Sequence, residues 1–211
     1  MTWLLCDYGE VLSTPPTKRD QARLAALAEW DPSLGDFWEA YWVDRPAYDR
    51  ADLTANEYWT RLLGRAPGAE QLQRLIEADA AGWLHPNDLS LAAVSRARQR
   101  GLRLALLSNA PVEVAERIDA VPWLASFTRR FFSCWLRAIK PEPAAYRSVL
   151  TALDARPEEV IFVDDRAPNV AAAAELGMDA RLFEGAAQFD EIADAVRSAG
   201  AGTPTSSNPP E

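Results

Sequence analysis

Several polar side chains stand at the ends of apolar segments, where their types and spacing could support chemistry: Asp7, Ser108, Asn109, Lys140, Asp164 and Asp165. Paired carboxylates provide the oxygen ligands that a hard cation such as Mg²⁺ prefers. A hydroxyl and a lysine ammonium group bind phosphate oxygens. A carboxylate that faces a phosphoryl group can act as a nucleophile. If these side chains meet in space, the sequence predicts a site for phosphoryl chemistry.

The elements that must position these residues alternate along the chain. Apolar segments predict strands at 2–7, 101–109, 130–135, 159–165 and 179–184. Helical patterns lie between them at 87–101, 110–121, 142–154 and 167–177. Strands that alternate with helices of this length predict an α/β fold, a Rossmann-like doubly wound parallel sheet with helices on both faces. Sites in such folds lie beyond the carboxyl ends of the strands, which is where the polar side chains stand.

Residues 16–86 interrupt this alternation with a helix-like segment that is rich in aromatic side chains. Within it, Thr54 is followed three residues later by Glu57, a capping-box pattern that marks the start of a helix. We therefore predict a catalytic core formed by residues 1–15 and 87–197 and a helical cap, 16–86, inserted after the first strand. The segment 198–211 is rich in Ser, Pro, Gly and Thr and is predicted to be a disordered tail.

Composition excludes several classes of protein. The chain has 211 residues, of which 48% are hydrophobic, and a formal net charge of −9. The negative charge argues against nucleic acid or an anionic membrane as a partner. We find no signal-peptide pattern and no apolar run near the ~18 residues needed to cross a membrane. The expectation is a cytoplasmic protein that acts on a small molecule, and the sequence leaves its oligomeric state open.

Four segments, taken in order, resemble the motifs of the haloacid dehalogenase (HAD) superfamily. They read LLCDYGEVL, LALLSN, IKPEPAAY and VIFVDDRAPNVAAAAELGM. The position of the insert resembles the helical-cap subclass of that superfamily. The resemblance extends over nearly the whole chain apart from the tail, and its fourth segment is the most specific. It implies a Rossmann-like core, Mg²⁺ as cofactor and an aspartate nucleophile.

The resemblance also implies a role for each polar side chain. Asp7 would be the nucleophile, and Ser108 and Lys140 would hold the phosphoryl group and the charge on Asp7. Asn109 would join Ser108 and Lys140 in binding a small phosphorylated substrate.

The metal ligands that the resemblance implies are two carboxylates, a third that acts directly or through water, and a backbone carbonyl. Asp7 and Asp165 would bind Mg²⁺, with Asp164 as the third carboxylate. The carbonyl of Gly9 would complete the set.

Gly9 is also where the sequence departs from the family pattern. Phosphatases of this family usually carry a second aspartate there, which protonates the leaving group and then activates water. General acid–base help is worth ~10²–10⁴-fold in rate. Glu10 is the nearest acid, but it lies one residue further on and is expected to point elsewhere.

Three hypotheses for function remain open. The first is a Mg²⁺-dependent phosphatase that acts through an aspartyl-phosphate. The second is a 2-haloacid dehalogenase, in which the aspartate attacks carbon without a metal. The third is a degenerate HAD fold that binds a ligand without catalysis. We favour the phosphatase because two adjacent acids, Asp164 and Asp165, repel each other without a cation.

Overall fold

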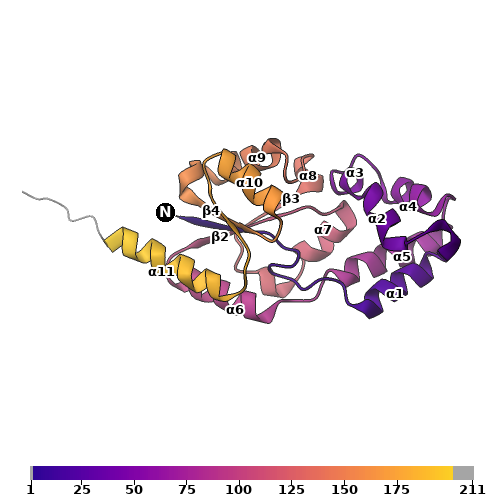
Figure 1. The fold of residues 1–211 in the computed structure, drawn as a ribbon, viewed down its shortest axis with the longest axis horizontal. Coiled ribbons are helices and arrows are strands. Elements are labelled where there is room, and N and C mark those ends of the chain that lie inside the picture. Colours follow the sequence, from indigo (N-terminus) through magenta and orange to yellow (C-terminus); the bar gives the residue numbers. More distant parts are fainter. Residues whose placement is uncertain (1, 202–211) are drawn as a thin grey trace, which may run out of the picture.

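A parallel sheet forms the centre of the structure, which is a computed structural model that describes residues 2–201. Its strands are β1 (Trp3–Cys6), β2 (Arg103–Ser108), β3 (Arg129–Phe132), β4 (Val160–Asp164) and β5 (Asp179–Leu182). They pair in the order β3-β2-β1-β4-β5, and all four pairings are parallel (Figure 1). The prediction of a Rossmann-like parallel sheet is confirmed.

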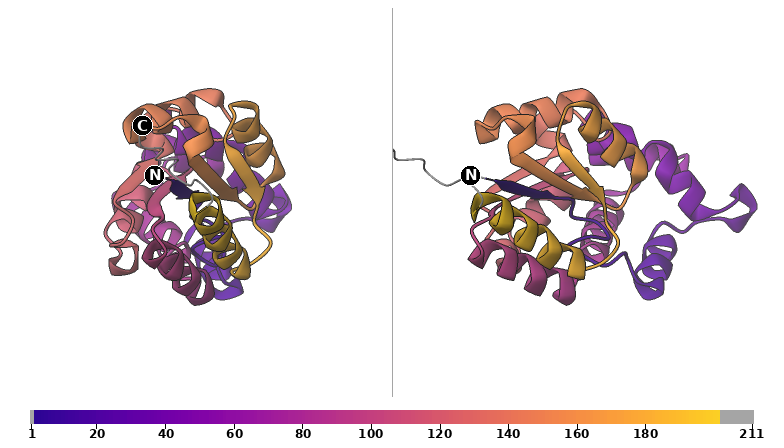
Figure 2. Two further views of the ribbon diagram at one scale, coloured as in Figure 1. Left: turned by 90° about the vertical axis from the view of Figure 1, so that its left-hand side faces the viewer. Right: turned by 60° about the vertical axis from the view of Figure 1, so that its left-hand side comes forward.

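Helices cover both faces of the sheet, so side chains on either side of a central strand are buried. This is why the central strands are continuous apolar runs. One face packs against α6 (Asp88–Gln99), α7 (Val112–Asp119) and α11 (Ala187–Ala201). The other face packs against α9 (Pro143–Leu153) and α10 (Ala167–Glu175). Figure 2 shows the sheet between these two helical layers. Leu4 and Cys6 belong to the first core and Trp3 and Leu5 to the second, which is the alternation expected of a strand.

The insert between β1 and β2 is helical, as predicted, and has a hydrophobic core of its own. Its helices are α1 (Lys18–Leu27), α2 (Phe37–Val43), α3 (Arg45–Asp49), α4 (Ala55–Leu63) and α5 (Ala69–Gly82). The side chains of Thr54 and Glu57 close the predicted capping box at the start of α4. Figure 1 shows these helices beyond one end of the sheet, with α3 beside α8 (Ser133–Leu136). Most of the aromatic side chains of the segment fill this separate core.

The two chain segments that join the insert to the sheet are paired with each other. Ser13 forms an antiparallel bridge with Pro86. The amide of Thr14 donates to the carbonyl of His85 at 2.8 Å, and the amide of Asn87 donates to the carbonyl of Leu12 at 2.9 Å. This pairing holds the start and the end of the insert together next to the end of β1.

Two boundaries differ from the predicted ones by three residues or more. The third strand ends at Phe132, because Ser133 begins the short helix α8 within the segment expected to be a strand. Helix α11 continues to Ala201, four residues into the predicted tail, and the rest of that tail lies outside the described residues. Within residues 2–201, no helix is both long and apolar enough to cross a membrane.

Candidate active site

The predicted site residues come together at the carboxyl ends of the three central strands. Asp7 follows β1, Ser108 ends β2 and Asp164 ends β4. Lys140 reaches the same point from the loop before α9. These strands are neighbours in the sheet, so their ends lie side by side. A cavity of about 570 Å³ opens above them, lined by core and cap residues.

Lys140 lies at the centre of this group of charges. Its Nζ is 2.6 Å from Oδ1 of Asp7 and 2.7 Å from Oδ2 of Asp164, and the residue is 3% exposed. Burial lowers the pKa of Lys140, but the carboxylates of Asp7 and Asp164 raise it by more, so its net pKa is above the usual value. The ammonium group is therefore charged at neutral pH.

The loop of Lys140 is fixed to the end of β2 through Asn109. The side-chain amide of Asn109 donates to the carbonyl of Lys140 at 2.9 Å, and its oxygen accepts from the Lys140 amide at 2.8 Å. Through these two hydrogen bonds the Asn109 side chain fixes the backbone of Lys140. Its predicted contact with substrate stays a prediction.

The Asp7 carboxylate is buried and carries a strongly shifted pKa. The pKa of Asp7 is raised to about 8, because burial and the nearby charge of Asp164 together outweigh the lowering by Lys140. Oδ1 of Asp7 accepts from the amide of Tyr8 at 2.6 Å and faces Lys140. Because both contacts use Oδ1, they fix the orientation of the carboxylate.

The two adjacent acids after β4 have different surroundings. Asp164 is fully buried, and its Oδ1 accepts from the amide of Arg166 and from Nδ2 of Asn169, both at 2.9 Å. Its Oδ2 accepts from Lys140. Asp165 is half-buried and lines the cavity, and its pKa is raised by burial and by the charge of Asp164.

The donor set fits a hard divalent cation. Asp7, Asp164 and Asp165 each offer a carboxylate oxygen, and these oxygens lie within 4.8 Å of one another. Three carboxylates and one lysine leave a formal charge of −2, which a divalent cation would balance. Since Asp164 is engaged by Lys140 and Asn169, Asp7 and Asp165 have the greater capacity to bind a metal directly. The carbonyl of Gly9 accepts none of the backbone hydrogen bonds in its turn.

Ser108 presents an unused hydroxyl to the cavity. The residue is 4% exposed, and its Oγ makes no hydrogen bond with any described residue. The hydroxyl is not one of the fully enclosed atoms that lack a partner, so it is reached from the cavity. Its place in the cavity lining makes a bound oxygen the natural acceptor.

Gly9 has no positive φ, so aspartate there would meet no left-handed strain. A Cβ at this position would lie 3.6 Å from the indole of Trp83, an ordinary contact. Glu10 takes the left-handed conformation, with φ of 58°, and lines the cavity. The expectation that the Glu10 carboxylate points elsewhere stays a prediction.

Sequence reasoning missed the contribution of the insert to the cavity. Arg45 and Asp49 of α3 line it and are both buried, and Trp42 and Trp83 add aromatic walls. The four-residue spacing of Arg45 and Asp49 on a helix could have indicated an ion pair. Its burial depends on Asp79, 34 positions after Arg45, which no local pattern links to it.

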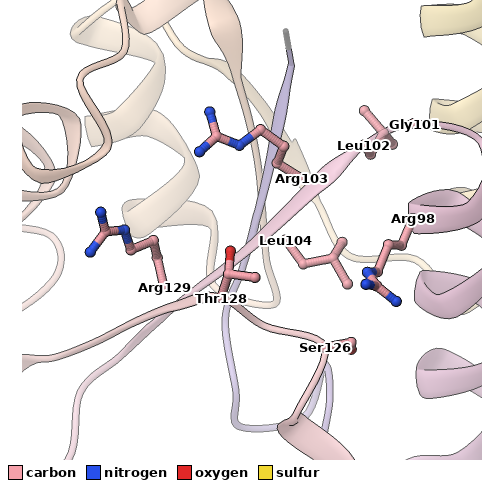
Figure 3. Close-up of a pocket in the computed structure, with 8 residues that line it drawn as sticks. All are labelled: Arg98, Gly101, Leu102, Arg103, Leu104, Ser126, Thr128 and Arg129. Carbon is pink, nitrogen blue, oxygen red and sulfur yellow. The ribbon is translucent and has the colours of Figure 1, made fainter.

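A second cavity, of about 560 Å³, lies at the amino ends of β2 and β3. Its lining includes Arg98, Arg103 and Arg129, all of them exposed. Figure 3 shows the side chains of Arg103 and Arg129 extending away from that of Arg98. The guanidinium of Arg103 lies 3.8 Å from the ring centroid of Trp3. These cations do not converge on one point.

A parallel α/β core with acids and a lysine at its carboxyl edge, under an inserted helical segment, defines a class of hydrolase. A family model described as haloacid dehalogenase-like hydrolase matches residues 14–177. The chain belongs to this family. The matched range contains Ser108, Lys140, Asp164 and Asp165, but it begins after Asp7.

Curated relatives include hydrolases from animals and plants. Bifunctional epoxide hydrolase 2 of Mus musculus is 28% identical over 181 residues, which is 83% of this chain and 29% of the relative. Flavin mononucleotide hydrolase 1 of Arabidopsis thaliana is 43% identical over 68 residues, 32% of this chain and 28% of the relative. The chain spans less than a third of the length of these relatives.

Solved structures share the fold. A HAD family enzyme from Bacteroides thetaiotaomicron, in complex with magnesium and inorganic phosphate, has a TM-score of 0.70 at 20% identity over 86% of this chain and 93% of that one. A 2-haloacid dehalogenase from Pseudomonas syringae pv. tomato has a TM-score of 0.60 at 18% identity over 93% and 100%. At these identities the likeness shows the fold alone.

Proposed function

We propose that the protein is a Mg²⁺-dependent phosphatase that acts on a small phosphorylated metabolite through an aspartyl-phosphate on Asp7. The observation that carries the proposal is the buried cluster of Asp7, Lys140 and Asp164 with Asp165 beside it, at the floor of the cavity. Residues 16–86 are then the cap domain over a core formed by 1–15 and 87–197.

The chemistry has two steps. An oxygen of Asp7 forms a bond to phosphorus while the bond from phosphorus to the leaving-group oxygen breaks, and that oxygen departs with the electron pair and gains a proton. Water then attacks phosphorus and loses a proton, the bond from phosphorus to Asp7 breaks, and inorganic phosphate leaves. Asp7 returns to its carboxylate form.

Lys140 and Ser108 hold the transferring group. The ammonium of Lys140 lies within 2.7 Å of two carboxylates, so it neutralises charge both before and during attack. The unpartnered hydroxyl of Ser108 donates to a phosphoryl oxygen. Asn109 keeps Lys140 in place through its two bonds to the lysine backbone.

The magnesium ion would be held by Asp7, Asp165 and the carbonyl of Gly9. Asp164, which already accepts from Lys140, would bind it directly or through water. When bound, the ion supplies charge stabilisation for the phosphoryl oxygens. The acid cluster supports this proposal over dehalogenation, because Lys140 balances the charge of one carboxylate and a reaction at carbon without a cation leaves the rest of the Asp7, Asp164 and Asp165 cluster uncompensated.

The proposal is tested by phosphate release from p-nitrophenyl phosphate with Mg²⁺ and with EDTA, run beside halide release from 2-chloropropionate. Phosphate release that requires Mg²⁺, with no halide release, supports the phosphatase. Halide release that is indifferent to EDTA overturns it in favour of the dehalogenase. Neither activity would leave a binding protein with a degenerate site.

A further inference from the structure

The cap end of the active-site cavity contains a built polar site that the phosphoryl chemistry does not use. Arg45 and Asp49, both on α3, line the cavity and are 3% and 7% exposed. Nε of Arg45 donates to Oδ1 of Asp49 at 2.7 Å. Nη1 of Arg45 donates to Oδ2 of Asp79 at 3.0 Å, and the hydroxyl of Tyr41 donates to Oδ1 of Asp79 at 2.7 Å.

This network leaves polar atoms without a protein partner at the cavity wall. Oδ2 of Asp49 accepts no hydrogen bond from any described residue. The two N–H groups of Nη2 on Arg45 enter none of the bonds above. Burying an ionised pair is costly, and it is offset only when the remaining hydrogen-bonding atoms are also satisfied. Because Arg45 and Asp49 both line the cavity, their unused donor and acceptor suit a ligand that supplies the opposite groups.

The charge of the cap end narrows the chemistry of that ligand. One guanidinium, Arg45, is matched by two buried carboxylates, Asp49 and Asp79, so the formal charge is −1. A second phosphate or a carboxylate on the substrate would face net repulsion here in a region of low dielectric. Hydroxyl groups, which both donate and accept, suit a carboxylate oxygen next to a guanidinium.

Two indole rings add apolar walls to the same cavity. Trp42 and Trp83 line the cavity, with ring centroids 6.4 Å apart and planes at 75°. Trp42 is 49% exposed, which places it at the mouth. Indole faces pack well against C–H groups while leaving neighbouring hydroxyls to polar partners.

We propose that Arg45 and Asp49 select an uncharged polyhydroxy leaving group, a sugar or polyol, with Asp49 accepting from one hydroxyl and Arg45 donating to its neighbour. The inference rests on the proposed phosphatase function and adds the substrate class. Binding at the cap end positions the phosphoryl group against Asp7 without a second charge on the substrate.

The test compares wild-type kcat/KM, in Mg²⁺, for four phosphate esters of primary alcohols. Glycerol phosphate and a hexose phosphate carry uncharged hydroxyls, n-propyl phosphate carries none, and phosphoglycerate carries a carboxylate. We expect the two hydroxylated esters to exceed the other two by ~10-fold or more, the worth of one hydrogen bond to a charged group. Reaction with p-nitrophenyl phosphate serves as the measure of phosphoryl chemistry.

The variant Asp49→Asn isolates the proposed contact. It keeps an acceptor for Arg45 and replaces Oδ2 with a donor, so kcat/KM for the hydroxylated esters should fall ~10- to 100-fold. The ratio of kcat/KM for these esters to kcat/KM for p-nitrophenyl phosphate should fall by a similar factor, and the melting temperature reports that the variant is folded. Asp52→Asn is the matched control, because Asp52 is an exposed acid three residues further on that pairs with Arg50.

The outcomes separate the two proposals. If wild type releases no phosphate from p-nitrophenyl phosphate, the phosphatase function and this inference both fail. If it does so but hydrolyses phosphoglycerate or n-propyl phosphate as well as the hydroxylated esters, only the inference is overturned. An equal loss on every substrate in Asp49→Asn would also overturn it, since the residue would then be structural.

Discussion

Two cavities of nearly equal volume, about 570 and 560 Å³, lie at opposite ends of the same parallel strands. At the carboxyl ends, Asp7, Lys140 and Asp164 are buried, and Nζ of Lys140 lies within 2.7 Å of an oxygen of each carboxylate. At the amino ends, the arginines are exposed and extend apart (Figure 3). The charges at the carboxyl ends are close together and buried, and the charges at the amino ends are exposed to solvent.

The difference teaches that convergence and burial, rather than volume or charge alone, distinguish a reactive cavity. Exposed charges interact through water and are worth little to one another. Buried charges interact strongly and shift each other's pKa, as Asp7 and Lys140 do. Parallel strands also make the two ends unequal, since only the carboxyl ends lead into the loops that carry the acids.

The largest contrast is expected from removing one cation at each end. Lys140→Met leaves Asp7 and Asp164 buried without their partner, so the free energy of unfolding should fall by ~3–5 kcal/mol. Phosphate release should be lost. Arg98→Met at the amino-end cavity should change stability by less than ~0.5 kcal/mol. Thermal melts and phosphate assays of both variants check this, and equal effects would erase the distinction.

Ser108→Ala tests the hydroxyl that has no partner. Its loss should lower kcat/KM for phosphate release by ~10²-fold, as for other single donors to a developing anion. Stability should be nearly unchanged, because Oγ makes no hydrogen bond with any described residue. Ser126→Ala, in the amino-end cavity, is the matched control and should leave kcat/KM at the wild-type value. A silent Ser108→Ala would remove this residue from the site.

Gly9→Asp sharpens the account of the missing acid. Without an acid, wild type should hydrolyse aryl phosphates faster than alkyl phosphates, because an aryl leaving group needs a proton less. The variant should lower the ratio of the aryl rate to the alkyl rate. We expect the gain on alkyl substrates to stay within the ~10²–10⁴ of a well-placed acid, and the added Cβ makes only an ordinary contact with Trp83. Gly9→Ala adds the same Cβ without the carboxylate and should leave the ratio unchanged. An unchanged ratio in a folded Gly9→Asp would point to Glu10 or a substrate group as the donor.

A further prediction is a pH dependence of stability without metal. The pKa of Asp7, raised by burial to about 8, means that the folded protein holds a proton that the unfolded chain has released. Stability should therefore fall as pH rises from about 4 towards 8, by at most ~1.4 kcal/mol per pH unit. Thermal melts in EDTA between pH 6 and 8 check the slope. Asp7→Asn should flatten it, and Mg²⁺ should raise the melting temperature of wild type most at the higher pH.

The core and the strand ends could be predicted because local patterns determine them. The apolar run before Asp7 and the run before Asp164 both read as buried strands, and parallel topology brings such ends together. The predicted third strand extends past the observed end at Phe132, because the apolar run continues into the short helix α8. The segment alone does not distinguish the two.

The cap half of the site could not be predicted, for a physical reason. In the sequence, Arg45 and Asp49 have the spacing of an ordinary surface ion pair on a helix. In the structure, Asp79 and Tyr41 form a hydrogen-bonded network with Arg45 and the pair is buried. The contact between position 9 and Trp83 also joins residues far apart in the chain. When segments far apart in the chain bury a charge, no periodic pattern in the sequence indicates it, so these contacts could be identified only from the structure.

The most direct measurement of the central claim is the rate of Mg²⁺-dependent phosphate release by Asp7→Asn beside Arg103→Gln. The first changes the proposed nucleophile to a neutral amide of the same shape, and the second removes a cation from the amino-end cavity. We predict a loss of ~10³-fold or more for Asp7→Asn and a rate within about twofold of wild type for Arg103→Gln. Near wild-type phosphate release by a folded Asp7→Asn protein would contradict the account.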